Sequence, residues 1–124
     1  MPDDVGHLFV YGTLRPGDVR WHLLSPYVIG EGDDDSVAGT VYDTGRGYPA
    51  AIFGGEGTIR GRTYRLASER RLEALAVLDA EESSVPGGYT RTIVVTASGV
   101  TAWAYGYGDG LELTEIESGD WLSR

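Results

Sequence analysis

The sequence predicts an α+β domain in which one main helix packs against a small curled β-sheet or barrel. Short segments in which apolar and polar residues alternate recur along the chain, and six or seven of them predict strands. Glycine accounts for 19 of the 124 residues, which is typical of many tight turns between short strands. A good helical period is present in one segment alone, around residues 68–82.

The first half of the chain is expected to consist mainly of strands and turns. Alternating residues predict strands over four segments: 5–11, 37–43, 50–53 and 58–66. Residues 19–29 mix large apolar side chains with a proline and predict a short helical turn and a loop. The acidic residues 31–36 predict a polar turn, and residues 45–49 interrupt the pattern with glycine and proline. Gly54 and Gly55 predict a turn between two of the strands.

The main helix is predicted to begin at Ser68, a suitable N-cap that is followed by an acidic residue favoured by the helix dipole. Four residues at helical spacing are expected to share one face: Leu72, Leu75, Ala76 and Asp79. The helix is expected to end between Leu78 and Glu82, because the Pro-Gly-Gly sequence at 86–88 cannot continue it.

Residues 89–97 and 100–107 predict two strands joined at Ser98 and Gly99, which form the clearest hairpin in the sequence. Side chains on the second strand alternate between large and small. The large face carries Trp103, Tyr105 and Tyr107, and the small face carries Ala102, Ala104 and Gly106. The small face allows close packing of another element, whereas the aromatic face suits either a core or the wall of a cavity.

Composition narrows the class of protein. Hydrophobic residues make up 41% of the chain, and we expect a single globular domain over residues 1–124. The formal net charge of −9 repels phosphate backbones and anionic membranes, so neither nucleic acid nor a membrane is an expected partner. The acidic start and the absence of a long apolar run argue against a signal peptide and a spanning helix. The predicted location is cytoplasmic.

Most standard catalytic patterns are missing. Cysteine is absent, which excludes disulfides, thiol catalysis and thiolate metal sites. There is no nucleophile elbow and no Walker-type glycine loop, and His7 and His22 lack the spacing of a zinc-binding helix. Asp33, Asp34 and Asp35 lack the spaced oxygen ligands of a calcium loop, so a solvated acidic turn is favoured over a cation site. Carboxylates, hydroxyls and backbone groups remain for any reaction.

Two segments stand out for chemistry. The run Tyr11-Gly12-Thr13-Leu14-Arg15-Pro16-Gly17 follows the first strand and turns at once, which frees backbone groups for a ligand. A plain strand-to-turn junction is its structural alternative. Asp79, Glu81 and Glu82 crowd the end of the helix, where negative charge opposes the helix dipole. A local rule broken in this way indicates function, and a hydrated, frayed helix end is the alternative.

Both segments resemble signatures of the γ-glutamylcyclotransferase-like (AIG2-like) family, in its γ-glutamylamine cyclotransferase branch. The first match is the run at 11–17, and the second is Asp79-Ala80-Glu81-Glu82 followed by Tyr89-Thr90-Arg91. Weaker matches occur at four other places: 39–43, 48–50, Gly61 before Tyr64, and 103–105. The resemblance thus extends from Leu8 to about Tyr107.

This resemblance implies the γ-glutamylcyclotransferase-like fold, a small curled mixed sheet or barrel with one main helix. It also implies an enzyme that releases 5-oxoproline from a γ-glutamyl amine, peptide or biosynthetic intermediate by intramolecular aminolysis. Glu82 aligns with the catalytic glutamate of the family and is the implied general acid/base, and neither a metal nor an organic cofactor is needed. Five other residues are implied in binding the small-molecule substrate: Tyr11, Gly12, Thr13, Leu14 and Tyr89.

The chain departs from the family pattern on both sides of Glu82. Family members usually carry an aromatic or apolar residue before this position and a glycine after it, whereas this chain has Glu81 and Ser83. A non-catalytic domain that binds a small amino compound or a partner chain therefore stays open as an alternative. Because neighbouring helical residues diverge by about 100°, only one glutamate can enter a pocket. We expect Glu82 to point into a concavity floored by the backbone of residues 11–14, and Glu81 to face solvent.

Overall fold

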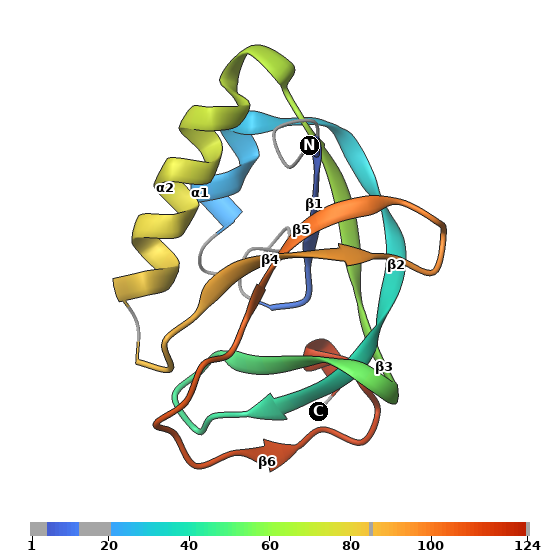
Figure 1. The fold of residues 1–124 in the computed structure, drawn as a ribbon, viewed down its shortest axis with the longest axis vertical. Helices are drawn as coiled ribbons and strands as arrows, with labels where there is room; N and C mark the ends of the chain where they lie inside the picture. The colour runs from blue at the N-terminus through green and yellow to red at the C-terminus, as the bar shows by residue number, and fades with distance from the viewer. Residues whose placement is uncertain (1–4, 13–20, 85, 124) are drawn as a thin grey trace.

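The computed structural model describes residues 5–12, 21–84 and 86–123, and within them six strands form one curled mixed sheet (Figure 1). The strands are β1 (His7–Val10), β2 (Val28–Asp43), β3 (Pro49–Leu66), β4 (Thr90–Val95), β5 (Thr101–Gly106) and β6 (Thr114–Glu115). Their order across the sheet is β4-β5-β1-β3-β2-β6. Neighbouring strands run antiparallel except for β1 and β5, which run parallel.

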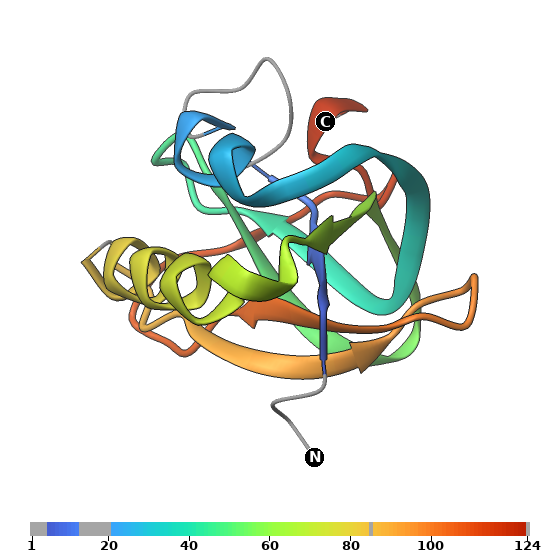
Figure 2. The same ribbon diagram turned by 90° about the horizontal axis from the view of Figure 1, so that it is seen from above.

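Two helices cover one side of this sheet, the short α1 (Trp21–Leu24) and the main α2 (Arg71–Ser84). Three 3-10 turns complete the described elements: η2 (Ser25–Tyr27), η3 (Ser68–Arg70) and η4 (Trp121–Ser123). Figure 2 shows both helices beside the sheet while the long strands β2 and β3 bend around the other side. The expected α+β architecture, with one main helix on a curled sheet, is confirmed. No helix in the described ranges is long and apolar enough to cross a membrane.

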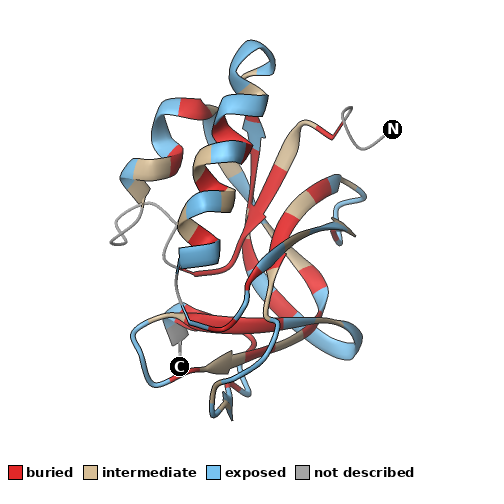
Figure 3. Ribbon diagram, turned by 60° about the vertical axis from the view of Figure 1, so that its left-hand side comes forward, coloured by how far each residue is buried: buried red, intermediate tan, exposed pale blue. Residues whose placement is uncertain are grey.

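The central strand β1 is buried on both faces. Leu8 and Val10 belong to a core that lies between the sheet and the helices, whereas Phe9 and Tyr11 belong to a second core inside the curl. This two-residue alternation is what a pleated strand produces when both of its faces are covered. Figure 3 shows the buried residues concentrated along the central strands and on the side of α2 that faces them.

The hairpin of β4 and β5 forms as expected, with Ile93 opposite Trp103. Ala102 and Ala104 are fully buried in the core inside the curl, where their small side chains let the strands approach closely. Trp103 and Tyr105 point the other way and pack in the core beneath the helices. The predicted separation of small and aromatic faces on this strand is therefore confirmed.

The predicted acidic turn at 31–36 is wrong, because these residues continue strand β2. Asp33, Asp34 and Asp35 pair with residues 61–63 of β3, after an irregularity that follows Ile29. Pairing with β3 supplies the backbone hydrogen bonds that a turn would otherwise have provided. Arg62 also donates to Asp34 at 2.8 Å, so a basic neighbour compensates part of the acidic run.

The predicted turn at Gly54 and Gly55 is also wrong, because both residues lie within the continuous strand β3. Ala38 of β2 pairs with Thr58, but the next residue, Gly39, pairs with Phe53. Residues 54–57 therefore bulge out of the ladder without ending the strand. Gly54 and Gly55 have φ values of 100° and 83°, which glycine adopts without the steric cost of a Cβ.

The buried face of α2 differs from the predicted one. It consists of Ala74, Leu75, Leu78 and Glu82. Leu72 is 74% exposed, so the helix is rotated relative to the predicted face and only Leu75 is common to both. Both sets of residues have helical spacing, and packing in the core beneath the helices decides between them.

Both ends of α2 also differ from the prediction. Ser68 lies inside the 3-10 turn η3, whose N-cap is Ala67 with no side-chain hydrogen bond, so Ser68 is not the N-cap. At the other end the helix continues two residues past Glu82. The hydroxyls of Ser83 and Ser84 donate to the carbonyls of residues 80 and 81, and thereby pair with carbonyls in the final turn.

Asp35 joins the tip of the β4–β5 hairpin to the long strands. Its carboxylate accepts hydrogen bonds from the Thr63 hydroxyl at 2.9 Å and from the backbone N–H and hydroxyl of Ser98 at 3.2 and 2.7 Å. Burial raises the pKa of Asp35, but hydrogen bonds from Ser98, Thr96, Ser36 and Thr63 outweigh it and lower the pKa to about 2. This carboxylate therefore helps to close the curl of the sheet.

Replacing the carboxylate should weaken this closure. We expect Asp35→Asn to lower the free energy of unfolding at neutral pH by about 1 kcal/mol, because hydrogen bonds to charged groups stabilise by roughly 1.5–3 kcal/mol and partial exposure weakens them. The folded-state pKa lies below the unfolded one, so the contribution is complete above about pH 4 and disappears as the pH falls through about 2. In thermal unfolding, the Tm difference between the wild type and Asp35→Asn should shrink as the pH falls from 4 to 2. A Tm difference that stays constant over that range would contradict this role.

Candidate active site

Glu82 is held by the last turn of α2 on the helix face that packs against the sheet. It follows Leu78 by four residues, and both side chains are buried, with Glu82 only 5% exposed. Glu81 is partly exposed. The two neighbouring glutamates thus occupy different environments, and Glu82 is the one that lies inside.

Tyr11 and Gly12 follow strand β1 and are both buried. The Tyr11 hydroxyl donates to the backbone carbonyl of Tyr105 at 2.6 Å, which ties this segment to β5. A Cβ on Gly12 would lie 2.6 Å from Cγ of Pro49, so the missing side chain allows Pro49 to pack there. Thr13 and Leu14, the other half of the predicted floor, lie outside the described residues, and the concavity stays a prediction.

Tyr89 contacts the same residue, Pro49, through a hydrogen bond. Its ring is 5% exposed, and its hydroxyl donates to the carbonyl of Pro49 at 2.6 Å. The ring also makes edge-on contacts with Tyr48 and Tyr107, at centroid distances of 6.1 and 5.9 Å. Gly12 and Tyr89, which are 77 positions apart in sequence, therefore meet at Pro49.

Asp79 connects α2 to both strands of the hairpin. It accepts the Tyr105 hydroxyl at 2.6 Å and two nitrogens of Arg91 at 3.1 and 3.2 Å. Burial raises the pKa of Tyr105, the hydrogen bond to Asp79 and its charge raise it further, and the negative charge of Glu82 adds to the effect. Tyr105 is therefore within electrostatic reach of both carboxylates, and it stays protonated.

The described structure thus brings four of the six predicted site residues into one neighbourhood: Tyr11, Gly12, Glu82 and Tyr89. Tyr105 relates two of them, since its carbonyl accepts the hydroxyl of Tyr11 and the charge of Glu82 helps to raise its pKa, while Gly12 and Tyr89 both contact Pro49. The sequence pattern predicts that Tyr105 lies on an aromatic face that suits a core or a cavity wall, but does not indicate its hydrogen bonds to Tyr11 and Asp79. Pro49 belongs to one of the weaker family matches, and no pattern in the sequence indicates that Gly12 and Tyr89 both contact it.

A cleft of about 490 Å³ lies between α2 and the hairpin. Its walls are Asp79, Ser83, Tyr89, Thr90, Arg91, Trp103 and Tyr105. Part of the predicted aromatic face therefore does line a cavity. Among the described residues, no three or more His, Asp or Glu side chains are grouped so that they could hold a metal ion.

Comparison with known proteins identifies the family. The model of the family described as "Gamma-glutamyl cyclotransferase, AIG2-like" matches residues 8–123. The chain belongs to this family. It is 38% identical over 122 residues to the gamma-glutamylcyclotransferase family protein YtfP of Escherichia coli, with 94% of this chain and 96% of that protein covered. It is therefore a γ-glutamylcyclotransferase-like enzyme.

A second relative has a more specific name. The chain is 30% identical over 123 residues to the gamma-L-glutamyl-butirosin B gamma-glutamyl cyclotransferase of Niallia circulans, with 93% of this chain and 74% of that protein covered. Among solved structures, an uncharacterized protein of Pyrococcus horikoshii superposes with a TM-score of 0.70 at 22% identity, over 94% of this chain and 89% of that one. An AIG2-like protein of mouse gives a TM-score of 0.62 at 18% identity, over 90% and 86%. These structures confirm the fold.

The contact between Gly12 and Pro49 can be tested by adding one methyl group. Gly12→Ala should destabilise the protein by roughly 1–3 kcal/mol, because the new Cβ would overlap the proline ring. Gly6, just before the other end of β1, is the matched control, since a Cβ there would come no closer than 3.4 Å to a side-chain nitrogen of Arg71. Thermal unfolding of both variants measures the difference. Equal Tm values for the two would show that Pro49 does not constrain Gly12.

Proposed function

We propose that this enzyme releases 5-oxoproline from a γ-glutamyl amine, peptide or biosynthetic intermediate, with Glu82 as the general acid/base. The observation that carries the proposal is the burial of Glu82 at the end of α2, within electrostatic reach of Tyr105. The same Tyr105 anchors the Tyr11-Gly12 segment, which the family resemblance implies in substrate binding. The proposed reaction requires a carboxylate that transfers protons and a backbone segment that holds the glutamyl group, and Glu82 and the Tyr11-Gly12 segment are the candidates for these two roles.

The proposed reaction is an intramolecular aminolysis. The α-amine nitrogen of the γ-glutamyl group attacks its own side-chain carbonyl carbon, and a new C–N bond closes the five-membered lactam. The bond from that carbon to the leaving nitrogen breaks. Glu82 takes a proton from the attacking amine and returns one to the leaving nitrogen, so that no proton or electron is lost overall. One carboxylate can serve both steps in turn.

Ring closure leaves the protein little to supply beyond geometry and proton transfer. Well-oriented intramolecular reactions can lower the barrier by about 7–11 kcal/mol, provided that the reacting atoms are held close together. The protein has to keep the substrate folded, and the backbone N–H groups of residues 11–14 are proposed to hold its glutamyl part or the developing oxyanion. Neither step requires a metal or an organic cofactor.

The nature of the leaving amine depends on the rim of the proposed site. Loops 45–49 and 86–88 form part of this rim and contact each other, since the Tyr48 hydroxyl donates to the carbonyl of Pro86 at 3.0 Å. The name of the relative from Niallia circulans indicates that gamma-L-glutamyl-butirosin B is one substrate within the family. We therefore include biosynthetic intermediates, alongside simple amines and dipeptides, among the proposed substrates.

Substitution of Glu82 is the direct test. The purified protein should release 5-oxoproline from at least one member of a γ-glutamyl panel without added metal. Glu82→Gln should lower kcat by about 10²-fold or more, because the nearly isosteric amide cannot exchange a proton. Chromatography of the reaction mixture measures the product. Glu81→Gln is the matched control next to it and should keep most of the activity, since Glu81 is the more exposed of the pair.

Two outcomes would contradict the proposal. Full activity of Glu82→Gln would show that another group moves the proton. A wild-type protein that is inert on the whole panel, yet binds 5-oxoproline in calorimetry, would favour a binding domain on the same fold.

A further inference from the structure

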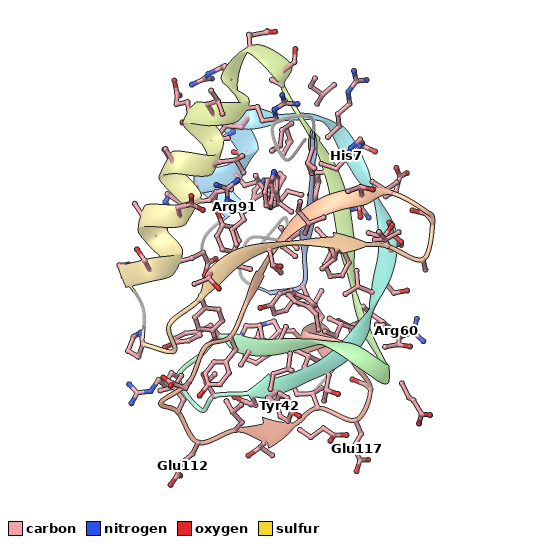
Figure 4. The ribbon with its side chains drawn as sticks, in the orientation of Figure 1. His7, Tyr42, Arg60, Arg91, Glu112 and Glu117 are labelled. Carbon is pink, nitrogen blue, oxygen red and sulfur yellow. The ribbon has the colours of Figure 1, made fainter. Side chains whose placement is uncertain are left out.

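The C-terminal end of α2 carries negative charge that no basic residue in the last turn of the helix balances. Asp79, Glu81 and Glu82 are all close to the C-terminus of the helix. Negative charge at this end of a helix opposes the helix dipole. The compensating charge comes instead from Arg91 on the neighbouring strand β4 (Figure 4).

The contacts of Asp79 have a defined geometry. Arg91 donates through two nitrogens, at 3.1 and 3.2 Å, and its guanidinium lies over the ring of Trp103 at 4.3 Å from the centroid. The Tyr105 hydroxyl donates to the same carboxylate at 2.6 Å from β5. One side chain of the helix is thus attached to both strands of the hairpin. A fork of two hydrogen bonds and a third donor restrict both the position and the rotation of this carboxylate.

Asp79 lies three residues before Glu82, which is slightly less than one helical turn. A helix that cannot rotate at Asp79 cannot rotate at Glu82 either, so the direction of the Glu82 side chain depends on the contacts of Asp79. Tyr105 adds a second restraint, because its backbone carbonyl accepts the hydroxyl of Tyr11. Tyr105 therefore contacts both parts of the proposed site: its hydroxyl holds the helix that carries the proposed acid/base, and its carbonyl holds the proposed substrate-binding segment.

We propose that Asp79, Arg91 and Tyr105 form a positioning junction that fixes the last turn of α2, and hence Glu82, relative to the Tyr11-Gly12 segment. This inference rests on the proposed function in that Glu82 is taken as the acid/base. The three residues act through Glu82 and Tyr11 and need not touch the substrate. Since the Tyr105 hydroxyl donates its hydrogen bond to Asp79, its proposed role is to hold the helix and not to donate a proton in the reaction.

The other end of α2 offers a matched control. There Glu73 pairs with Arg70 at 2.6 Å, and Arg70 lies over the Tyr27 ring at 4.6 Å. Hydrogen bonding to Glu73 raises the pKa of Tyr27. The same three residue types, an acid, an arginine and a tyrosine, thus meet at the start of the helix. Glu82 lies nine residues further along the helix than Glu73. Removing the Tyr27 hydroxyl therefore disturbs a similar contact without reaching the proposed site.

The experiment compares Tyr105→Phe with Tyr27→Phe by two independent measurements. Amide hydrogen exchange of residues 80–84 should become about tenfold faster in Tyr105→Phe and stay unchanged in Tyr27→Phe, as expected for loss of one hydrogen bond to a charged group. The kcat for 5-oxoproline release should fall at least tenfold in Tyr105→Phe, with KM changed less than about threefold, because positioning affects the reacting geometry more than binding. Tyr27→Phe should retain wild-type kcat.

Asp79→Asn provides a second variant if Tyr105→Phe folds poorly. It keeps an acceptor for the Tyr105 hydroxyl but loses the ion pair with Arg91, and it should also accelerate exchange at 80–84 and lower kcat. Unchanged exchange in both variants would overturn the junction, and so would faster exchange with a kcat within twofold of wild type. If the wild type is inert on the γ-glutamyl panel while Tyr105→Phe still accelerates exchange at 80–84 alone, the proposed function fails and the junction stands.

Discussion

The whole arrangement depends on burying the four-residue strand β1 on both of its faces. Leu8 and Val10 anchor the helices, and Phe9 together with Tyr11 fills the curl of the sheet. The strand is held between β3, which it pairs antiparallel, and β5, which it pairs parallel. Because β1 cannot shift by one residue without exchanging its two cores, its register is strongly determined. The residues that follow it therefore have fixed positions, with Tyr11 against β5 and Gly12 against Pro49.

Excess negative charge is the second constraint, and the fold accommodates it by contacts between elements distant in sequence. Asp34 forms an ion pair with Arg62, and Asp35 joins β2 to the hairpin through Ser98. Asp79 accepts hydrogen bonds from Arg91 and Tyr105. Each of these carboxylates is used to connect one element with another. The net charge of −9 is thus compatible with a tightly curled sheet, since several of the acids serve as hydrogen-bond acceptors where strands and helices meet.

Features that follow from a single, consistent spacing of apolar residues could be predicted from the sequence. Features that depend on pairing or packing with another segment of the chain could not. The alternation in β5 gave the correct faces, and the glutamate at 82 was correctly expected to be the inner one of the pair. Residues 31–36 have turn-like composition, but pairing with β3 overrides it. The rotation of α2 could not be predicted because two overlapping sets of residues have helical spacing, and the surface they pack against decides. The contact of Gly12 with Pro49 joins residues 37 positions apart, for which a single sequence carries no signal.

The two departures from the family pattern beside Glu82 affect the rim of the proposed site more than its centre. Glu81 and Ser83 flank the buried glutamate, but neither shares its inward face, because successive helical residues diverge by about 100°. The Ser83 hydroxyl donates to the carbonyl of residue 80, and with Ser84 it supports a helix that runs two residues past Glu82. A glycine after Glu82 would favour a helix that ends earlier.

The length of α2 determines where segment 86–88 begins, and the carbonyl of Pro86 there accepts a hydrogen bond from Tyr48 on the opposite loop. In the proposed enzyme, Ser83 therefore bears on the choice of leaving group, while the proposed acid/base, Glu82, remains on the buried face of α2.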